Sequence, residues 1–349
     1  MLKEHDAERL LEILKEADYS KNFRVLDSQL SLLFYQSKGV DSSQLEDSFY
    51  EDLLEKGILM QEKGMVYASV RVVFFEGNFF MVDSPHIAST GGISHYHSNK
   101  DGMYGFVGDD GLMLINYVIR GMKADRYQNG LDIGTGSGLI GISLLPWIDS
   151  IIGVDIMEPA ITWAQLNKKI NHVDRYFPRV GSLYEPVQEN GPFDFIVSNP
   201  SFSFSPPDFI TKYKVQEHEI SKDYGLEQVF KIIDGFSEHL TSNGRAVICT
   251  LAPIIYGEDY LINKIKKKYS DCRYSVKIHY NLIHKIPVEY EKYYRSCGIG
   301  RLNFVFITIV NGQDFLIKKS YSNLYFLSLF RWRFKVPLKL KRWLMKYLS

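Results

Sequence analysis

The chain of 349 residues has few cysteines, no long apolar run and no net charge, which argues against several special classes of protein. It contains only three cysteines and no CxxC pair, which favours inert thiols in a reducing compartment. It has no run of about 18 apolar residues, so no segment is expected to span a bilayer. Its formal net charge is zero, so no overall field should draw it to nucleic acid or to a membrane. Because the charged N-terminus is also unlike a signal peptide, we expect a cytoplasmic protein.

Aromatic residues, by contrast, are plentiful. The chain has 23 Tyr and 22 Phe, which suits a strand-rich core and aromatic pocket walls. The length is sufficient for one large α/β domain and a smaller one, and no internal repeat interrupts it.

Residues 1–83 are predicted to form a small α+β domain of the winged-helix type. Helical patterns near residues 10–14, 25–35 and 41–57 precede two β-hairpin patterns at 58–68 and 70–82. The third helical pattern would supply the recognition helix, but it carries six acidic residues and a single base, Lys56. This surface would repel phosphate, so we expect no duplex DNA binding. Packing on the other domain, dimerisation or covering a substrate pocket is favoured instead.

Residues 84–109 are rich in Gly, Ser, His and Asp, which is typical of a connecting loop region. The alternation of His95 and His97 would place two imidazoles on one face of a strand, and His86 lies nearby. No convincing set of Cys, Asp or Glu ligands completes a metal site, so none is predicted.

Strand and helix patterns alternate from residue 110 to 314, the range predicted for the catalytic domain. Strands are expected near 129–133, 151–155, 179–182, 193–198, 245–251, 273–283 and 302–310. Helices lie between most of them, although none of similar length is evident between the last two. The fold class is therefore α/β, with a Rossmann-like sheet of seven strands that is mostly parallel and has an antiparallel end.

A glycine-rich turn follows the first of these strands. A dinucleotide fingerprint requires its third glycine where Leu139 stands, and the carboxylate of Asp132 would sit badly beside a pyrophosphate. S-adenosylmethionine fits better, because it has no phosphate and carries an ammonium that Asp132 can attract directly or through water. Glycines let the backbone approach the methionine part, and the following helix N-terminus favours its carboxylate. The residues expected here are Asp132, Gly134, Thr135, Gly136 and Gly138.

The next strand ends at Asp155, whose carboxylate can accept hydrogen bonds from both ribose hydroxyls. The alternative is that Asp155 only caps the helix that begins near Glu158. Ile156 is expected beside it, and Ser182 and Leu183, after the third strand, are expected to flank the adenine.

The fourth strand is followed by Asn199, Pro200, Ser201 and Phe202. In a doubly wound sheet this turn should face the glycine loop at the point where strand order reverses. The Asn199 side-chain oxygen and the Pro200 carbonyl can hold an –NH₂ group by both hydrogens, and Phe202 can stack on a planar acceptor. Alignment then does most of the catalytic work, because a sulfonium is already a good leaving group. The alternative is an ordinary Asn-Pro turn.

With these motifs in this order, the chain resembles the class I S-adenosylmethionine-dependent methyltransferases over about residues 100–311. More narrowly it resembles the "methyltransferase small" group, which includes release-factor glutamine methyltransferases and adenine-N6 methyltransferases of ribosomal RNA. Segments 104–110, 180–186 and 223–226 are also similar to segments of that group. The resemblance implies that Phe106, Asp110 and Asn199 lie at the cofactor.

One position departs from the group's Asn-Pro-Pro-aromatic pattern, because Ser201 replaces the second proline. Serine gives this loop more freedom and adds a hydroxyl near the pocket. Ser201, Phe204 and Tyr224 are the residues expected at the acceptor.

The predicted function is methyl transfer from S-adenosylmethionine to a nitrogen, with oxygen as a second option. The acceptor can be a small molecule, a protein or RNA. Two alternatives stay open: other chemistry on the same cofactor that releases methylthioadenosine, namely aminocarboxypropyl transfer or cyclisation, and a non-catalytic binding module. A homodimer is also compatible with the sequence.

Residues 315–349 form a basic segment with no acidic residue. Pro337 can start an amphipathic helix, with Leu340, Trp343 and Leu344 on its apolar side. Packing of this helix on the domain is expected, with a weak contact to an anionic membrane or RNA as the alternative.

Overall fold

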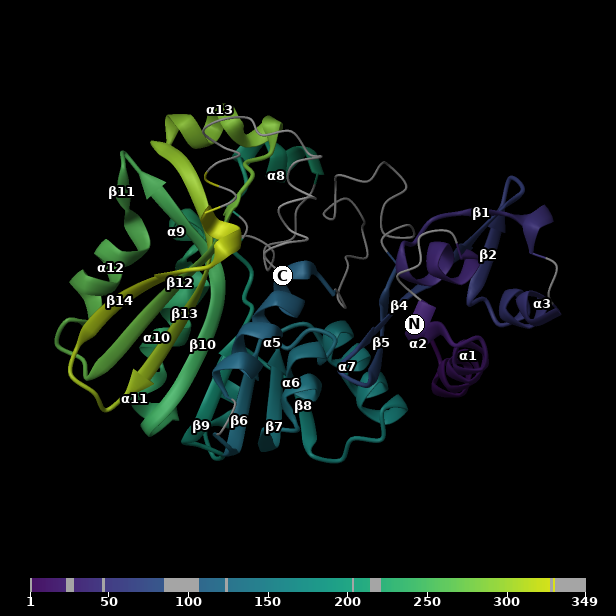
Figure 1. Cartoon of the computed structure of the whole chain (residues 1–349), viewed down its shortest axis with the longest axis horizontal. Helices are drawn as coiled ribbons and strands as arrows, with labels where there is room; N and C mark the ends of the chain where they lie inside the picture. The colour runs from purple at the N-terminus through teal and green to yellow at the C-terminus, as the bar shows by residue number, and fades with distance from the viewer. Residues whose placement is uncertain are drawn as a thin grey trace.

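The computed structural model describes residues 2–22, 28–45, 48–84, 107–122, 125–202, 204–213, 221–326 and 329. A large mixed sheet crosses the molecule in the order β14-β12-β13-β10-β9-β6-β7-β8 (Figure 1). These strands are β6 (Tyr127–Ile133), β7 (Ile148–Asp155), β8 (Tyr176–Val180), β9 (Phe193–Ser198), β10 (Leu240–Ile255), β12 (Tyr274–His284), β13 (Ile299–Asn311) and β14 (Leu316–Tyr321). The short strand β11 (Glu258–Asp259) pairs with β10.

Strand directions agree with the predicted doubly wound sheet. The strands from β10 to β8 are parallel, and β13 runs antiparallel between β10 and β12. β6 lies between β7 and β9, so strand order reverses there. Ile133 is in register with both Val154 and Ser198. The carboxyl ends of these three strands therefore lie side by side.

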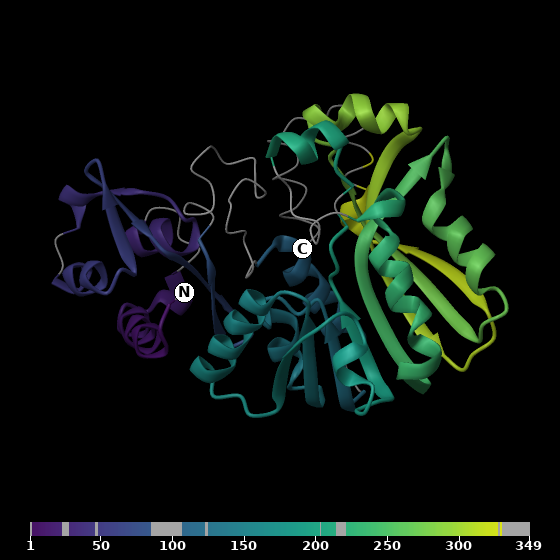
Figure 2. The same cartoon turned by 180° about the vertical axis from the view of Figure 1, so that it is seen from behind.

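Helices cover both faces of the sheet (Figure 2). α5 (Asp109–Gly121), α6 (Leu139–Leu144) and α7 (Glu158–Ile170) contribute to the core on one face. α10 (Glu227–Asp234), α11 (Phe236–His239) and α12 (Tyr260–Tyr269) cover the other face. The pattern of α12 explains this packing, because Leu261, Ile262 and Ile265 are buried at helical spacing while its last three lysines, residues 266–268, are exposed.

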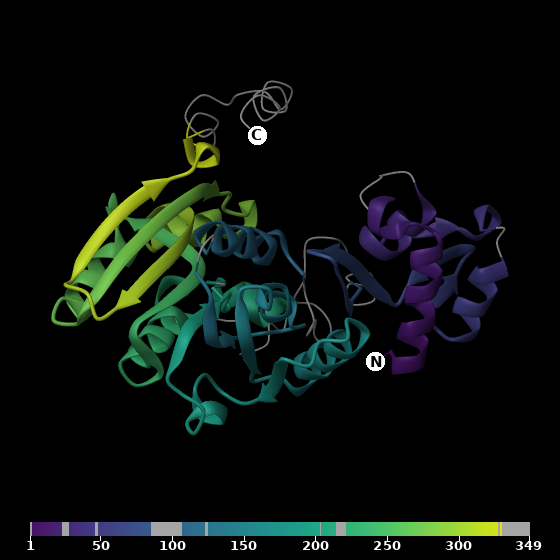
Figure 3. The ribbon, with the colours of Figure 1, turned by 60° about the horizontal axis from the view of Figure 1, so that its bottom comes forward.

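The connection after β12 and the strand at the sheet edge differ from the sequence prediction. α13 (Val288–Ser296) connects β12 to β13, where no helix was evident. Its sequence is largely polar and only Tyr290 and Tyr294 are buried, so its apolar periodicity is weak. β14 lies within the segment predicted as a tail from residue 315, and it runs along the outer edge of the sheet (Figure 3). It is exposed on both faces and carries two lysines, a common composition for an edge strand.

The N-terminal residues build a second core from α1 (Glu4–Glu16), the helical turn Ser31–Tyr35 and a three-stranded antiparallel sheet. Its strand order is β1-β3-β2, with β1 (Val40–Asp41), β2 (Leu59–Glu62) and β3 (Met65–Ala68). The helix expected over residues 41–57 is shorter. The Asp41 carboxylate accepts the Ser43 N–H and caps a separate 3₁₀ turn, and α3 spans Ser48–Glu55.

A separate hairpin of β4 (Val70–Phe75) and β5 (Asn78–Asp83) joins the two cores (Figure 1). Val72 and Met81 belong to the N-terminal core, whereas Phe80 and Val82 belong to the core of the large sheet. This division follows from strand alternation, which points successive side chains to opposite faces. On β4, Arg71 donates to the Tyr35 carbonyl and to the Val107 carbonyl, just before α5.

Some predicted features lie outside the described residues. These are the histidines at 86, 95 and 97, Phe106 and the helix expected after Pro337. None of the helices in the described part of the chain is long and apolar enough to cross a membrane.

Candidate functional site

The glycine loop after β6 has a backbone that only glycine adopts easily. Gly134, Gly136 and Gly138 have φ values of +72°, +53° and +81°. The N–H groups of Gly134 and Thr135 both donate to the Val154 carbonyl, at 2.8 and 3.0 Å, which fixes the loop over the end of β7. A Cβ built on Gly134 or Gly136 would meet no described atom within 4 Å. The loop is therefore held on the side of β7, and no described atom covers its other side at Gly134 and Gly136.

Asp132 lies beneath this loop and is completely buried. Its Oδ2 accepts hydrogen bonds from Thr135 Oγ1 at 2.6 Å and from the Gly141 N–H at 3.0 Å. Its Oδ1 has no hydrogen-bond partner among the described residues. Burial raises the pKa of Asp132 to about 7, against the lowering effect of the two hydrogen bonds. The Asp132 carboxylate therefore helps to fix the loop, and its expected attraction of a ligand ammonium, directly or through water, stays a prediction.

Tyr176, from the start of β8, completes this buried group of side chains. Its Oη lies 2.6 Å from Thr135 Oγ1. The ring fits only because two neighbours are glycines: a Cβ on Gly153 would lie 2.3 Å from Tyr176 Oη, and one on Gly141 would lie 2.6 Å from the ring. Tyr176 is not among the residues expected from the sequence, and the signal for it was the glycine inside strand β7.

Asp155, at the end of β7, holds the opposite side of the loop. Its Oδ2 accepts the Gly136 N–H at 2.9 Å, and its Oδ1 accepts the Met157 N–H at 3.0 Å, before α7 begins. The bond to Met157 agrees with the alternative role beside the start of α7, and contact with a ribose stays a prediction for this half-buried side chain. Next to it, Ile156 is 59% exposed, which is unusual for a large apolar side chain. The Gly181 N–H donates to the Asp155 carbonyl, which brings the turn containing Ser182 and Leu183 alongside.

Asn199 faces the loop from the end of β9. Its Nδ2 donates to Asp110 Oδ2, in the first turn of α5, at 2.7 Å. Its Oδ1 is buried and has no hydrogen-bond partner among the described residues. An ionised carboxylate can only accept hydrogen bonds, so Asp110 determines which end of the amide is the donor. The Asn199 oxygen is thus left as a fixed acceptor.

The segment after Asn199 is packed against a strained turn. Asp223 and Tyr224 have φ values of +55° and +56°, a region that non-glycine residues rarely occupy. Gly225 follows with a φ of +90°, and a Cβ there would lie 2.7 Å from the Phe202 carbonyl oxygen. The Asp223 carboxylate is held by the Tyr260 hydroxyl at 2.7 Å and by Lys264 of α12.

This strained turn brings Tyr224 into an aromatic cluster beside the Asn199 segment. The Tyr224 ring centroid lies 5.4 Å from that of Phe204 and 5.0 Å from that of Tyr260. Phe204 also contacts Tyr294 of α13, whose hydroxyl donates to the Phe204 carbonyl at 2.6 Å. The structure therefore brings the expected residues Phe204 and Tyr224 together, and it adds tyrosines from α12 and α13 that the sequence did not indicate.

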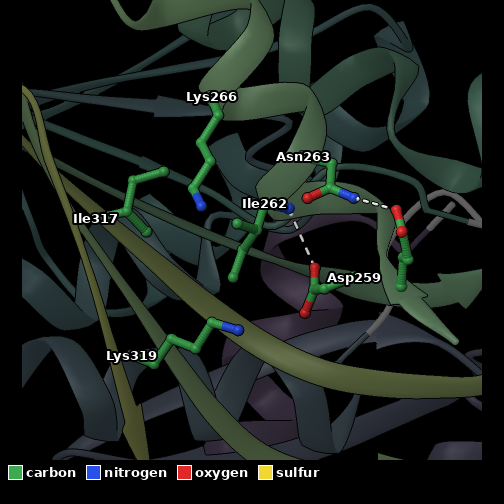
Figure 4. A pocket seen from close by; sticks show the side chains of 7 residues that line it. Asp259, Ile262, Asn263, Lys266, Ile317 and Lys319 are labelled. Carbon is green, nitrogen blue, oxygen red and sulfur yellow. Dashed lines mark hydrogen bonds between the residues drawn. The ribbon is translucent and has the colours of Figure 1, made fainter.

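A separate cavity of about 320 Å³ lies between α12 and β14 (Figure 4). Lys266 and Lys319 point toward it, and Asp259 at its side accepts the Ile262 N–H. None of the predicted site residues lines this cavity.

Comparison of the sequence with known proteins assigns the chain to a family. The sequence model of the family described as "Methyltransferase small domain" matches residues 111–212. A release factor glutamine methyltransferase of Aliivibrio fischeri is 31% identical over 124 residues, which are 34% of this chain and 43% of that protein. A putative protein N5-glutamine methyltransferase of Methanocaldococcus jannaschii is 31% identical over 160 residues, 45% of this chain and 76% of that protein.

Among solved structures, that of M. jannaschii TYW2 in complex with AdoMet matches with a TM-score of 0.41 and 12% identity, over 72% of this chain and 92% of that one. The chain spans less than half the length of the release factor glutamine methyltransferases of A. fischeri and Lactococcus lactis. Its similarity to the M. jannaschii methyltransferase covers three quarters of that protein, and the family match contains both the glycine loop and Asn199. The chain therefore belongs to the methyltransferase small domain family, whose members use S-adenosylmethionine as the methyl donor.

Proposed function

We propose that S-adenosylmethionine binds across the carboxyl ends of β6, β7 and β8 and that the protein methylates a glutamine side chain of another protein. The open space above Gly134 and Gly136 accommodates the methionine part. The Asp155 carboxylate, half-buried at the end of β7, suits the two ribose hydroxyls, and the exposed side chain of Ile156 suits an adenine ring. The residues present therefore fit the cofactor. When bound, it supplies an electrophilic methyl group on a sulfonium.

The acceptor half of the proposal is carried by one observation: the side-chain oxygen of Asn199 has no hydrogen-bond partner in the part of the chain that the structure describes. A buried acceptor without a partner costs about 1–3 kcal/mol, and an incoming N–H group would recover this energy. Because Asp110 fixes the side-chain amide of Asn199, the Asn199 oxygen can hold the –NH₂ group of an acceptor in one orientation. This hydrogen bond would orient the acceptor nitrogen toward the methyl group and stabilise the positive charge that develops on that nitrogen. As the N–C bond forms, the C–S bond of the sulfonium breaks, S-adenosylhomocysteine leaves and the nitrogen loses a proton to solvent.

The choice of glutamine follows from the aromatic side chains and from the relatives. A planar primary amide presents one face to an aromatic ring, for which Phe202 is the candidate. It presents two hydrogens to acceptors, for which the Asn199 side-chain oxygen and the Pro200 carbonyl are the candidates. The matching proteins of A. fischeri, L. lactis and M. jannaschii are all named for methylation of glutamine, the first two in release factors.

The proposal is tested with methyl-labelled S-adenosylmethionine and a bacterial release factor as acceptor. Incorporation of label that is lost when glutamines are replaced one at a time by glutamate would identify the acceptor residue. Release of S-adenosylhomocysteine is expected. Release of methylthioadenosine instead would refute methyl transfer, and label entering RNA but not protein would refute the acceptor class.

A variant pair separates catalysis from folding. Asn199→Ala should lower the methylation rate by about a hundredfold or more while leaving affinity for S-adenosylhomocysteine within about threefold. Asn129→Ala, at an exposed position near the start of β6, is the matched control and should act like the wild type. A wild-type rate for Asn199→Ala would exclude the proposed role of its oxygen.

A further inference from the structure

Asn167, on α7, connects two parts of the molecule that are far apart in sequence. Its side chain is completely buried. Oδ1 accepts the Met81 N–H at 2.8 Å, and Nδ2 donates to the Met81 carbonyl and to the Ser137 carbonyl, each at 2.9 Å. Met81 lies in the β4–β5 hairpin, and Ser137 lies between two glycines of the loop after β6. One amide thus ties the hairpin to the glycine loop.

Asn171, one helical turn later, bonds to the hairpin but not to the glycine loop. Its Oδ1 accepts the Phe79 N–H at 2.9 Å, and its Nδ2 donates to the Phe79 carbonyl at 2.7 Å. Its further hydrogen bond stays within α7, to the Asn167 carbonyl. Residues four apart on a helix and two apart on a strand have similar spacings, so the two asparagines satisfy the outer edge of β5 as a neighbouring strand would. Of these two asparagines, only Asn167 reaches the loop.

We propose that Asn167 is a positioning residue for the cofactor. Through Asn167, the affinity of the glycine loop for S-adenosylmethionine depends on the packing of the β4–β5 hairpin against α7. This inference rests on the proposed placement of S-adenosylmethionine at that loop. The Ser137 carbonyl belongs to the peptide between Ser137 and Gly138, and Gly136 and Gly138 have positive φ. Glycine backbones have wide conformational freedom, so the loop needs external hydrogen bonds to keep a single conformation. Ser137 is 1% exposed, so water cannot replace the amide as the donor.

The coupling must act in both directions. If a seated hairpin favours cofactor binding, then bound cofactor must stabilise the hairpin by the same free energy. The Met81 N–H reports this directly, because it is bonded to Asn167 Oδ1. The Phe79 N–H lies on the same strand but is bonded to Asn171, so it reports the same stabilisation less directly.

The decisive experiment compares Asn167→Leu with Asn171→Leu by calorimetry with S-adenosylhomocysteine. Both variants remove two hydrogen bonds to β5 and should lower the thermal midpoint to a similar extent. Only Asn167→Leu should weaken binding, by about tenfold, because a buried carbonyl of the loop loses its donor. Equal affinities for Asn167→Leu and the wild type, or an equal loss in Asn171→Leu, would overturn the proposal.

Hydrogen exchange of the wild-type protein tests the same inference without any substitution. Added S-adenosylhomocysteine should slow exchange of the Met81 N–H more than that of the Phe79 N–H. No added protection at Met81 would overturn the coupling while leaving the cofactor site intact. Failure of the wild type to bind, or full affinity in Asp155→Ala, would instead overturn the cofactor placement and this inference with it.

Discussion

Replacing Asp132 with asparagine should make the ligand-free protein more stable above neutral pH. The substitution keeps an oxygen to accept from Thr135 and Gly141 and removes the charge from a completely buried position. The pKa of Asp132 rises from the ordinary 3.8 to about 7 in the folded protein because of burial. Folding therefore favours the protonated carboxyl, so the contribution of Asp132 to stability is fully present below about pH 4 and is lost as the pH rises through about 7.

The size of the effect follows from the pKa shift. The rise in the pKa of Asp132 from 3.8 to about 7 corresponds to about 4 kcal/mol in the free energy of unfolding, at 1.36 kcal/mol per pKa unit. The two proteins should be of similar stability near pH 4. Between there and pH 7 the advantage of Asp132→Asn should grow by about 1.4 kcal/mol per pH unit and then level off.

Urea unfolding at a series of pH values between 4 and 8.5 measures this difference. Other carboxyl groups titrate in the same range, so the quantity of interest is the variant minus the wild type at each pH. Asp174→Asn, at an exposed position, controls for the removal of one charge. A difference that does not change with pH, or a less stable Asp132→Asn protein at pH 8, would refute the assignment of a buried, destabilising charge.

Three further predictions concern the same site. Asp155→Ala should weaken binding of S-adenosylhomocysteine in calorimetry by about tenfold or more, because the Gly136 N–H loses a charged acceptor; unchanged affinity would place the cofactor elsewhere. Gly153→Ala should lower the free energy of unfolding in urea by about 1–3 kcal/mol, because its Cβ would overlap Tyr176 Oη; a neutral result would show that the ring can move. Tyr260→Phe removes a donor to Asp223 and should raise KM for the acceptor while leaving cofactor affinity unchanged; a loss of cofactor affinity would argue against a role at the acceptor.

The sequence was most informative where a residue's role depends on its immediate neighbours. The glycines after β6 require positive φ, and the positions of Asp132, Asp155 and Asn199 at the strand ends follow from the strand patterns themselves. Other contributors were not foreseen, because their roles arise from contacts across the fold. In the sequence, Tyr176 is only a strand residue, and its role depends on the space that Gly141 and Gly153 leave for its ring. Asn167 is likewise only a helical asparagine, and its role depends on the packing of β5 beside α7.

The same reasoning explains the two elements that the patterns did not indicate. α13 and β14 bury few side chains, so their sequences carry little periodic signal. α13 nevertheless supplies Tyr294 to the aromatic cluster, so a weakly patterned helix contributes to the candidate acceptor site.

The shared hairpin also has a consequence for the order in which the chain can fold during synthesis. The N-terminal core is completed by Trp163, Leu166 and Ile170 of α7, which lie about 80 residues beyond the end of β5. A ribosome makes the chain from its N-terminus, so these three side chains emerge only after the first strands of the large sheet. The N-terminal segment therefore cannot complete its core until α7 has been made. Both cores should then form in one cooperative step, and a fragment ending at residue 83 should not fold alone.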